Sequence, residues 1–387
     1  MDDTEWALDK EARRISPSPD ALEATLARAR RRQARRRQGG VIAGIALIAV
    51  VGLVLWSLFG QIDSSSQQPG AAQGPIKIGG TPLEMSVAGG RVWVLTCNTS
   101  CSNDGRSSQG RLTQVDAQSG SILTTTDLDK PQALGVGEAG VWVASFWGSS
   151  ISKIDPDSGD VLSTTSLTLS AEVAPGDSAF SPTDVVVAGD AVWVVSGRGA
   201  IAKIDPSTGE VRDVLDLRSG SLGNAAIENT TVWVGDGVDG ILPIDAESGR
   251  AGSPVPIGDE ARRLAVSQVL AGGGYLWAAG LWADAVIDVT GHPDYELTDQ
   301  GVLARVDPAG AEQPVTAPLE SGSILLAYDQ GRLWVQSPSG EEVYSVDPSS
   351  LQIAQTIDLG SGRRVAAVGG SGLWEMDNSG SLIQVST

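Results

Sequence analysis

The chain has 387 residues, 41% of them hydrophobic, and carries a formal net charge of −20. This charge is unevenly distributed, because residues 1–40 carry a net charge of +3 while residues 61–387 are strongly acidic. Phosphate contacts require a cationic surface, so nucleic acid is excluded as a partner of the large acidic part.

The first 40 residues form a short segment that becomes rich in arginine toward its end. Ser18 is a suitable helix N-cap, Pro19 suits the first helical position, and Leu22 and Leu26 are one turn apart. We expect a partly helical, basic cytoplasmic tail whose arginines lie near anionic lipid headgroups.

An uncharged stretch, VIAGIALIAVVGLVLWSLFG, follows at residues 41–60. Twenty residues of helix span about 30 Å, the thickness of the hydrocarbon core of a bilayer. The arginines lie before this stretch and a neutral linker, residues 61–74, lies after it, which predicts a single membrane span with the N-terminus in the cytoplasm. A buried core helix and a cleaved signal peptide are less consistent with these flanks and with the length of the stretch.

The rest of the chain contains a repeat of about 40 residues. Each copy has an apolar strand with a central tryptophan: Trp93, Trp142, Trp193, Trp233, Trp277, Trp334 and Trp374. In six copies an aspartate opens a turn after the next strand: Asp116, Asp155, Asp205, Asp245, Asp307 and Asp347. We expect the tryptophans to pack between repeats and the aspartates to accept backbone N–H bonds within their turns. A ring of aspartates that binds metal is the less favoured interpretation.

Four strands in each of seven such units predict an all-β, seven-bladed β-propeller over residues 75–387. The seventh copy lacks a fourth strand, whereas a short strand at about residues 75–80, centred on Ile76–Ile78, has no partner before it. Pairing of this N-terminal strand with the C-terminal blade would close the ring and remove its open edges.

The repeated unit, an apolar strand, VWV and then I-D-P-x-T-G-x-V, is similar to the YVTN/NHL-type propellers and especially to the streptogramin (virginiamycin B) lyase-like repeats of bacteria. This resemblance implies the fold. The lyase itself uses a metal-supported acid–base site that contains histidines, and this chain has a single histidine, His292. We therefore assign no catalytic, cofactor-binding or metal-ligating residue from the resemblance.

Two insertions interrupt the repeat. The first, in copy one, contains both cysteines of the chain, Cys97 and Cys101. Outside the cytoplasm a disulfide between them is the favoured state, with free thiols or metal ligation as alternatives.

The second insertion, in copy five, places His292 among Asp284, Asp288, Asp294 and other acidic residues. A divalent-cation or polar-ligand site is one interpretation. A solvated acidic loop is favoured, because the spacing matches no known metal-binding loop.

Two classes of function remain. The favoured one is a membrane-anchored extracytoplasmic module that binds a protein, glycan or small molecule without a cofactor. The alternative is a metal-dependent lyase-like enzyme. Acidic side chains from several blades that converge at one mouth of the central channel would distinguish the two.

Overall fold

A computed structural model describes residues 74–98, 109–169, 179–188, 191–217, 222–287, 293–361, 364–369 and 372–385. These residues belong to a compact unit, Pro69–Thr387. The predicted tail, membrane span and linker lie outside the described residues, as do Cys101 and His292. Among the residues described, no helix has the length and apolar character needed to cross a membrane.

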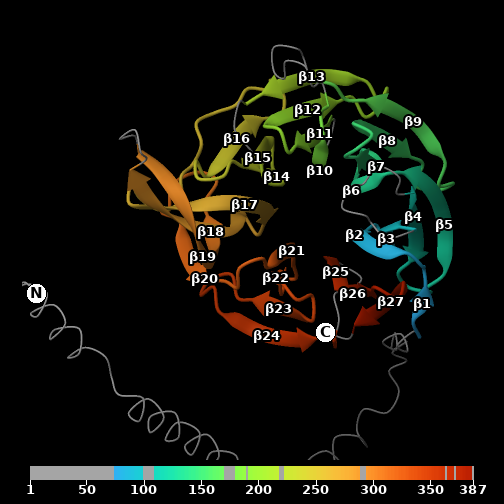
Figure 1. The fold of residues 1–387 in the computed structure, drawn as a ribbon. Helices are drawn as coiled ribbons and strands as arrows, with labels where there is room; N and C mark the ends of the chain where they lie inside the picture. The colour runs from blue at the N-terminus through green and yellow to red at the C-terminus, as the bar shows by residue number, and fades with distance from the viewer. Residues whose placement is uncertain are drawn as a thin grey trace, which may run out of the picture. The chain divides into compact units, whose positions relative to one another are not determined.

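The described strands form seven antiparallel sheets arranged as the blades of a propeller (Figure 1). Blade 1 comprises β2 (Thr81–Ala88), β3 (Arg91–Cys97), β4 (Gln109–Asp116) and β5 (Ile122–Asp129). Blade 2 comprises β6 (Pro131–Gly137), β7 (Gly140–Ser145), β8 (Ser150–Ile154) and β9 (Val161–Ser166). Blade 3 comprises β10 (Pro182–Ala188), β11 (Ala191–Ser196), β12 (Ala200–Ile204) and β13 (Val211–Asp216). The seven-bladed β-propeller is therefore confirmed.

The remaining blades complete the ring. Blade 4 comprises β14 (Ala225–Glu228), β15 (Thr231–Gly235) and β16 (Ile241–Asp245). Blade 5 comprises β17 (Arg262–Gly272), β18 (Tyr275–Ile287), β19 (Pro293–Val306) and β20 (Val315–Pro318). Blade 6 comprises β21 (Ile324–Asp329), β22 (Arg332–Gln336), β23 (Glu342–Val346) and β24 (Ile353–Asp358). Blade 7 comprises β25 (Arg364–Gly369), β26 (Gly372–Asp377), β27 (Ser381–Val385) and β1 (Ile76–Lys77).

The N-terminal strand closes the ring, as predicted. Ile76 pairs with Leu382 and Lys77 with Ser381, and the N–H of Ile78 donates to the carbonyl of Gly380 at 2.9 Å. Gly380 has a positive φ, and a Cβ there would lie 2.5 Å from the Cα of Gly79, so this seam requires a glycine.

Blade 4 differs from the expectation of four strands, because its described sheet has three. In place of an outer strand, residues 251–255 make two isolated bridges, Ala251 to Ile244 and Val255 to Ile241. Pro254 and Pro256 lie in or next to this segment. Each lacks a backbone N–H, so a continuous ladder of hydrogen bonds cannot form there.

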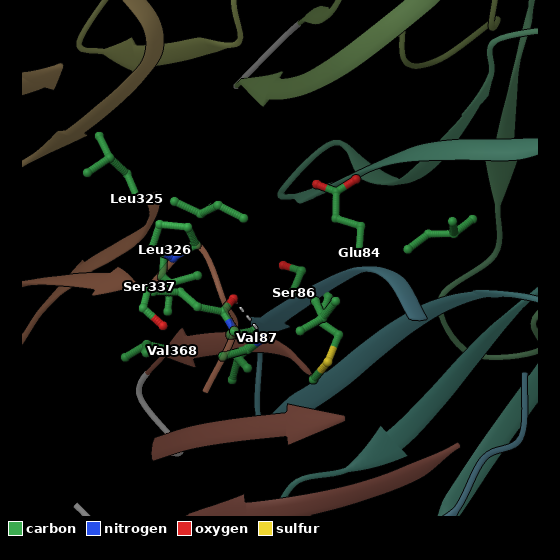
Figure 2. Close-up of a pocket in the computed structure, with 16 residues that line it drawn as sticks. Glu84, Ser86, Val87, Leu325, Leu326, Ser337 and Val368 are labelled. Atoms are coloured by element: carbon green, nitrogen blue, oxygen red, sulfur yellow. Dashed lines mark hydrogen bonds between the residues drawn. The ribbon is translucent and has the colours of Figure 1, made fainter. Parts of the chain in front are cut away.

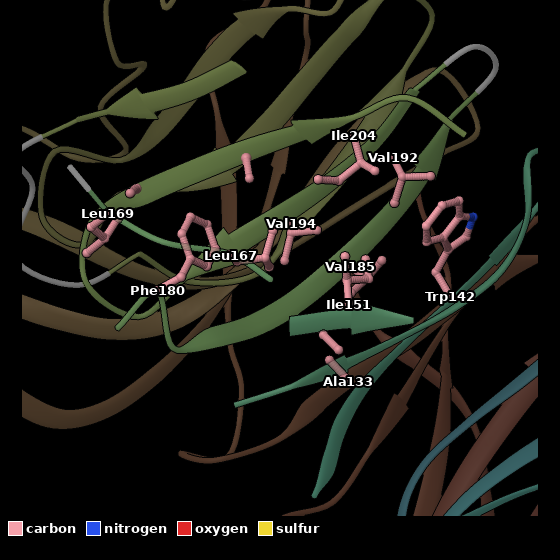
Figure 3. Close-up of a cluster of buried hydrophobic side chains, with 13 residues drawn as sticks. Ala133, Trp142, Ile151, Leu167, Leu169, Phe180, Val185, Val192, Val194 and Ile204 are labelled. Atoms are coloured by element: carbon pink, nitrogen blue, oxygen red, sulfur yellow. The ribbon is translucent and has the colours of Figure 1, made fainter. Parts of the chain in front are cut away.

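The repeated tryptophans pack between blades, as predicted. Figure 3 shows Trp142 of β7 in one apolar cluster with Val185 and Val192 of blade 3. The other six tryptophans likewise share a cluster with residues of the following blade. All seven are buried. The core of the molecule therefore consists of seven interblade layers.

The repeated aspartates are turn residues, as predicted. In the turn after β8, Asp155 Oδ1 accepts the backbone N–H groups of Asp157 at 2.8 Å and Ser158 at 2.9 Å. These hydrogen bonds to the charged form lower the pKa of Asp155 below its usual value. Each of the other five aspartates also accepts a backbone N–H from its own turn.

The alternating direction of the strands gives the propeller two distinct faces. One carries the aspartate turns between third and fourth strands, and we call it the Asp-turn face. On the other face each inner strand begins and each second strand ends, so β3 ends there at Cys97 and β18 ends there at Ile287. We call it the insertion face.

The expectation of a solvated loop in blade 5 is wrong for most of that segment. Strands β18 and β19 continue into it as a paired hairpin, in which Asp284 lies opposite Glu296 and Ile287 lies opposite Pro293. Apart from Asp284, residues 281–287 (LWADAVI) are apolar or aromatic, so this part of the insertion suits a strand although the insertion as a whole is acidic.

Candidate functional site

A cavity of about 310 Å³ opens at the central channel, where the inner strands of blades 1, 6 and 7 approach one another. Most residues that line it are aliphatic, among them Leu83 and Val87 from β2, Leu325 and Leu326 from β21 and Val368 from β25. Figure 2 shows Glu84 and Ser86 across the cavity from Leu325 and Leu326, and polar groups make up about half of the cavity surface. Such a composition is typical of sites for small ligands.

A β-bulge places Glu84 at this cavity. The pairing of β2 with β3 shifts register between Pro82 and Glu84, close to the start of the inner strand. Blade 3 has an equivalent bulge, because β10 shifts register against β11 between Pro182 and Asp184. Bulges redirect side chains, and here each of them follows a proline and delivers a carboxyl group at the insertion face.

Both carboxyl groups link neighbouring blades. Glu84 Oε2 accepts the backbone N–H of Leu134 in blade 2 at 2.8 Å, and Asp184 Oδ2 accepts that of Ala225 in blade 4 at 2.7 Å. Gln268 in blade 5 forms the same kind of bond, because its Oε1 accepts the N–H of Leu325 in blade 6 at 2.8 Å. The inner strands are thus joined around the channel by side chains rather than by strand pairing.

The acidity of the two carboxyl groups is strongly perturbed. Burial, and to a lesser extent the negative charge of Asp184, raise the pKa of Glu84 to about 8 against the opposing effect of the hydrogen bond from Leu134. Burial also raises the pKa of Asp184, against the hydrogen bonds from Ala225 and Val185. Glu84 therefore changes charge near neutral pH.

Acidic side chains from two blades thus interact across the channel near the insertion face. Within the described ranges, no three or more histidine, cysteine, aspartate or glutamate side chains come close enough together to hold a metal ion. Glu84 offers hydrogen bonding and charge next to the aliphatic side chains of the cavity.

The residues singled out from the sequence lie elsewhere. Cys97 ends β3 and is buried, and it is not a free thiol. Its predicted partner, Cys101, lies outside the described residues, so the disulfide stays a prediction. His292 also lies outside them, and Asp284 from the same insertion forms an ion pair with Arg262 at 2.8 Å.

Sequence reasoning missed Glu84 and Asp184. A usable signal was present, because a proline two residues before an acidic residue opens the inner strand in both Pro82-Leu83-Glu84 and Pro182-Thr183-Asp184. The position after the corresponding bulge is alanine in blade 2 and glutamine in blade 5, so an acidic residue there is a feature of blades 1 and 3.

No family model and no curated protein sequence matches the chain. Among solved structures, the chain is similar to BamB from Moraxella catarrhalis, with a TM-score of 0.53 and 13% sequence identity over 81% of this chain and 99% of that one. It is also similar to the computationally designed Ika8 protein, with a TM-score of 0.53 and 11% identity over 79% of this chain and 96% of that one. These likenesses support the propeller fold, and the resemblance to streptogramin lyase-like proteins stays a hypothesis.

Proposed function

We propose that the chain is a membrane-anchored, extracytoplasmic binding module that holds its ligand in the channel cavity beside Glu84. The uncharged residues 41–60 and the preceding arginines support the anchor and its orientation. The observation that carries the binding function is the cavity itself, in which aliphatic side chains and polar groups share the surface and one carboxyl group has a perturbed pKa.

The cavity wall defines the chemistry of the ligand. The aliphatic side chains favour an apolar group, and Glu84 favours a hydrogen-bond donor next to it. A ligand that carries an amine gains a charge-assisted hydrogen bond once Glu84 is ionised. We propose that the ligand, whether a small molecule or a side chain of a partner protein, presents an apolar group with an amine or another donor.

Binding of 2-phenylethylamine to the full-length chain in detergent micelles tests this proposal. The amine stays protonated up to about pH 10, whereas Glu84 ionises as the pH rises through about 8. We expect the affinity to rise by about threefold or more between pH 6 and pH 9. Saturation-transfer NMR from protein to probe measures it.

Two variants at the cavity serve as probe and control. Ser86→Phe fills the cavity and is expected to remove the signal, while Ser86→Ala is expected to retain it. Glu84→Gln is expected to bind without pH dependence. An equal signal from the Ser86→Phe variant, or an unchanged affinity between pH 6 and pH 9 in the unmodified chain, would contradict the proposal.

A further inference from the structure

A wide bulge interrupts the long hairpin of blade 5. Leu281 pairs with Gly301 and Ala283 pairs with Leu297, so residues 298–300 of β19 face the single residue Trp282 of β18. Bulges are concentrated next to binding and active sites, because they redirect side chains without disturbing the rest of a sheet. Here three residues of β19 lie opposite the one residue of β18 that carries an indole ring.

The bulge borders a groove of about 550 Å³ that is separate from the channel cavity. Trp282, Asp299 and Gln300 line one side of it, and residues 316–321 line the other. A Cβ on Gly301 would lie 2.5 Å from the carbonyl oxygen of Leu319, so this glycine allows the segment after β20 to cross β19 closely. The two backbone segments are also hydrogen-bonded at this point, because the N–H of Leu319 donates to the carbonyl of Gly301 at 3.0 Å.

The indole ring of Trp282 is held in place before any ligand arrives. The guanidinium of Arg262 lies 5.3 Å from the centre of the ring. Arg262 is itself fixed by an ion pair from its Nε to Asp284 at 2.8 Å and by a hydrogen bond from Nη2 to Gln300 Oε1 at 2.9 Å. A half-buried aromatic ring locked in this way is a preorganised platform.

We propose that this groove binds a carbohydrate. Arg262 covers one face of the Trp282 ring, and only the part of the indole that lines the groove is open to a ligand. The apolar C–H face of a sugar ring packs on that part, and its hydroxyl groups donate to carboxylates and exchange hydrogen bonds with amides and hydroxyls. The groove supplies these partners at its exposed rim in Asp299, Gln300, Thr316 and Glu320.

The position of Arg262 decides between a neutral and a cationic ligand. A cation would be attracted to the face of Trp282, but the guanidinium already occupies that interaction. A second positive charge beside the same ring would be repelled by Arg262. A neutral, polyhydroxylated ligand avoids this repulsion and still uses both carboxylates as acceptors.

Disaccharide binding to the full-length chain tests the proposal, in a detergent without a sugar headgroup. Maltose, cellobiose, lactose and N,N′-diacetylchitobiose are the probes, and saturation-transfer NMR is the measurement. We expect at least one of them to bind, and Trp282→Ala to weaken that binding at least about tenfold, which corresponds to about 1.4 kcal/mol. Trp282→Phe keeps an aromatic platform and is expected to retain part of the affinity.

Trp147 provides the matched control. It is 48% exposed in the turn between β7 and β8, on the same insertion face but in blade 2. Trp147→Ala is expected to leave disaccharide binding unchanged, as is Glu84→Gln in the channel. The proposal would be overturned if none of the four disaccharides bound. It would also be overturned if binding survived in both the Trp282→Ala and the Asp299→Asn variants, or if tetramethylammonium bound in a Trp282-dependent manner instead.

Discussion

Glu84 shows how one side chain links stability to pH in this ring. Its pKa in the folded protein is about 8, above the ordinary value of 4.5, so the folded state binds the proton more tightly than the unfolded state does. The favourable contribution of the protonated group is complete below about pH 4.5 and is lost as the pH rises through about 8. At pH values above about 4.5 this carboxyl group therefore lowers the stability of the fold relative to an uncharged side chain in the same place.

Glu84→Gln should remove this cost, because an amide keeps an acceptor for the N–H of Leu134 without a charge. We expect the variant to be more stable than the unmodified chain by about 1–3 kcal/mol at pH 9, and by much less at pH 5. Denaturant unfolding at both pH values measures the difference. The exposed Glu138→Gln in the turn of blade 2 is the control, and an equal shift in that variant would contradict the assignment to Glu84.

At the scale of elements, each second strand joins its blade to the next one through a tryptophan. Trp193 of β11 packs in a cluster with Val232 and Ile244 of blade 4. Lys203 on the neighbouring strand β12 lies opposite Trp193, and its Nζ is 5.3 Å from the centre of the indole ring. The same Nζ donates to the carbonyl of Ala246 in blade 4 at 2.5 Å. The same arrangement recurs at Trp142, where Lys153 lies over the ring and its Nζ donates to the carbonyl of Pro206 in the aspartate turn of blade 3.

Trp193→Ala should therefore separate blades 3 and 4 rather than weaken one strand. We expect a loss of about 3–5 kcal/mol in the free energy of unfolding, because a fully buried indole is removed from the interface. The exposed Trp147→Ala is the matched control and should change stability by less than about 0.5 kcal/mol. Chemical denaturation of both variants decides the matter, and similar losses would refute the interblade role.

At the scale of the whole molecule, the seam between β1 and β27 makes the ring continuous. Ile78 is buried beside Trp374 and Met85 in the cluster that joins blades 7 and 1. We expect Ile78→Asp to lower the free energy of unfolding by about 2–4 kcal/mol and to accelerate hydrogen exchange in β1 and β27 first. Ile122→Asp on the outer strand β5, where the side chain is 47% exposed, is the control. Uniform exchange in both variants would argue against a local seam.

The ring and its seam could be predicted because both follow from residues that repeat at regular spacing in the sequence. Trp93 to Trp374 and Asp116 to Asp347 repeat in register, and an unpaired strand at Ile76 matched a missing strand after the last repeat. The prediction of four strands was wrong for blade 4, because Pro254 and Pro256 prevent a regular outer strand there. Glu84 and Asp184 could not be brought together from sequence, because they are about 100 residues apart and meet only once bulges and ring geometry are in place.

The closing seam also constrains the order in which the molecule can fold. Lys77 and Ser381 are 304 positions apart in the chain, so β1 is synthesised long before the strand with which it pairs. The length-dependent part of the entropic cost of closing such a loop is about 5 kcal/mol in free energy. Until β27 is complete, both ends of the array present unpaired strand edges to other chains. We therefore expect slow refolding that is sensitive to protein concentration, with the final step governed by the pairing of β27 with β1.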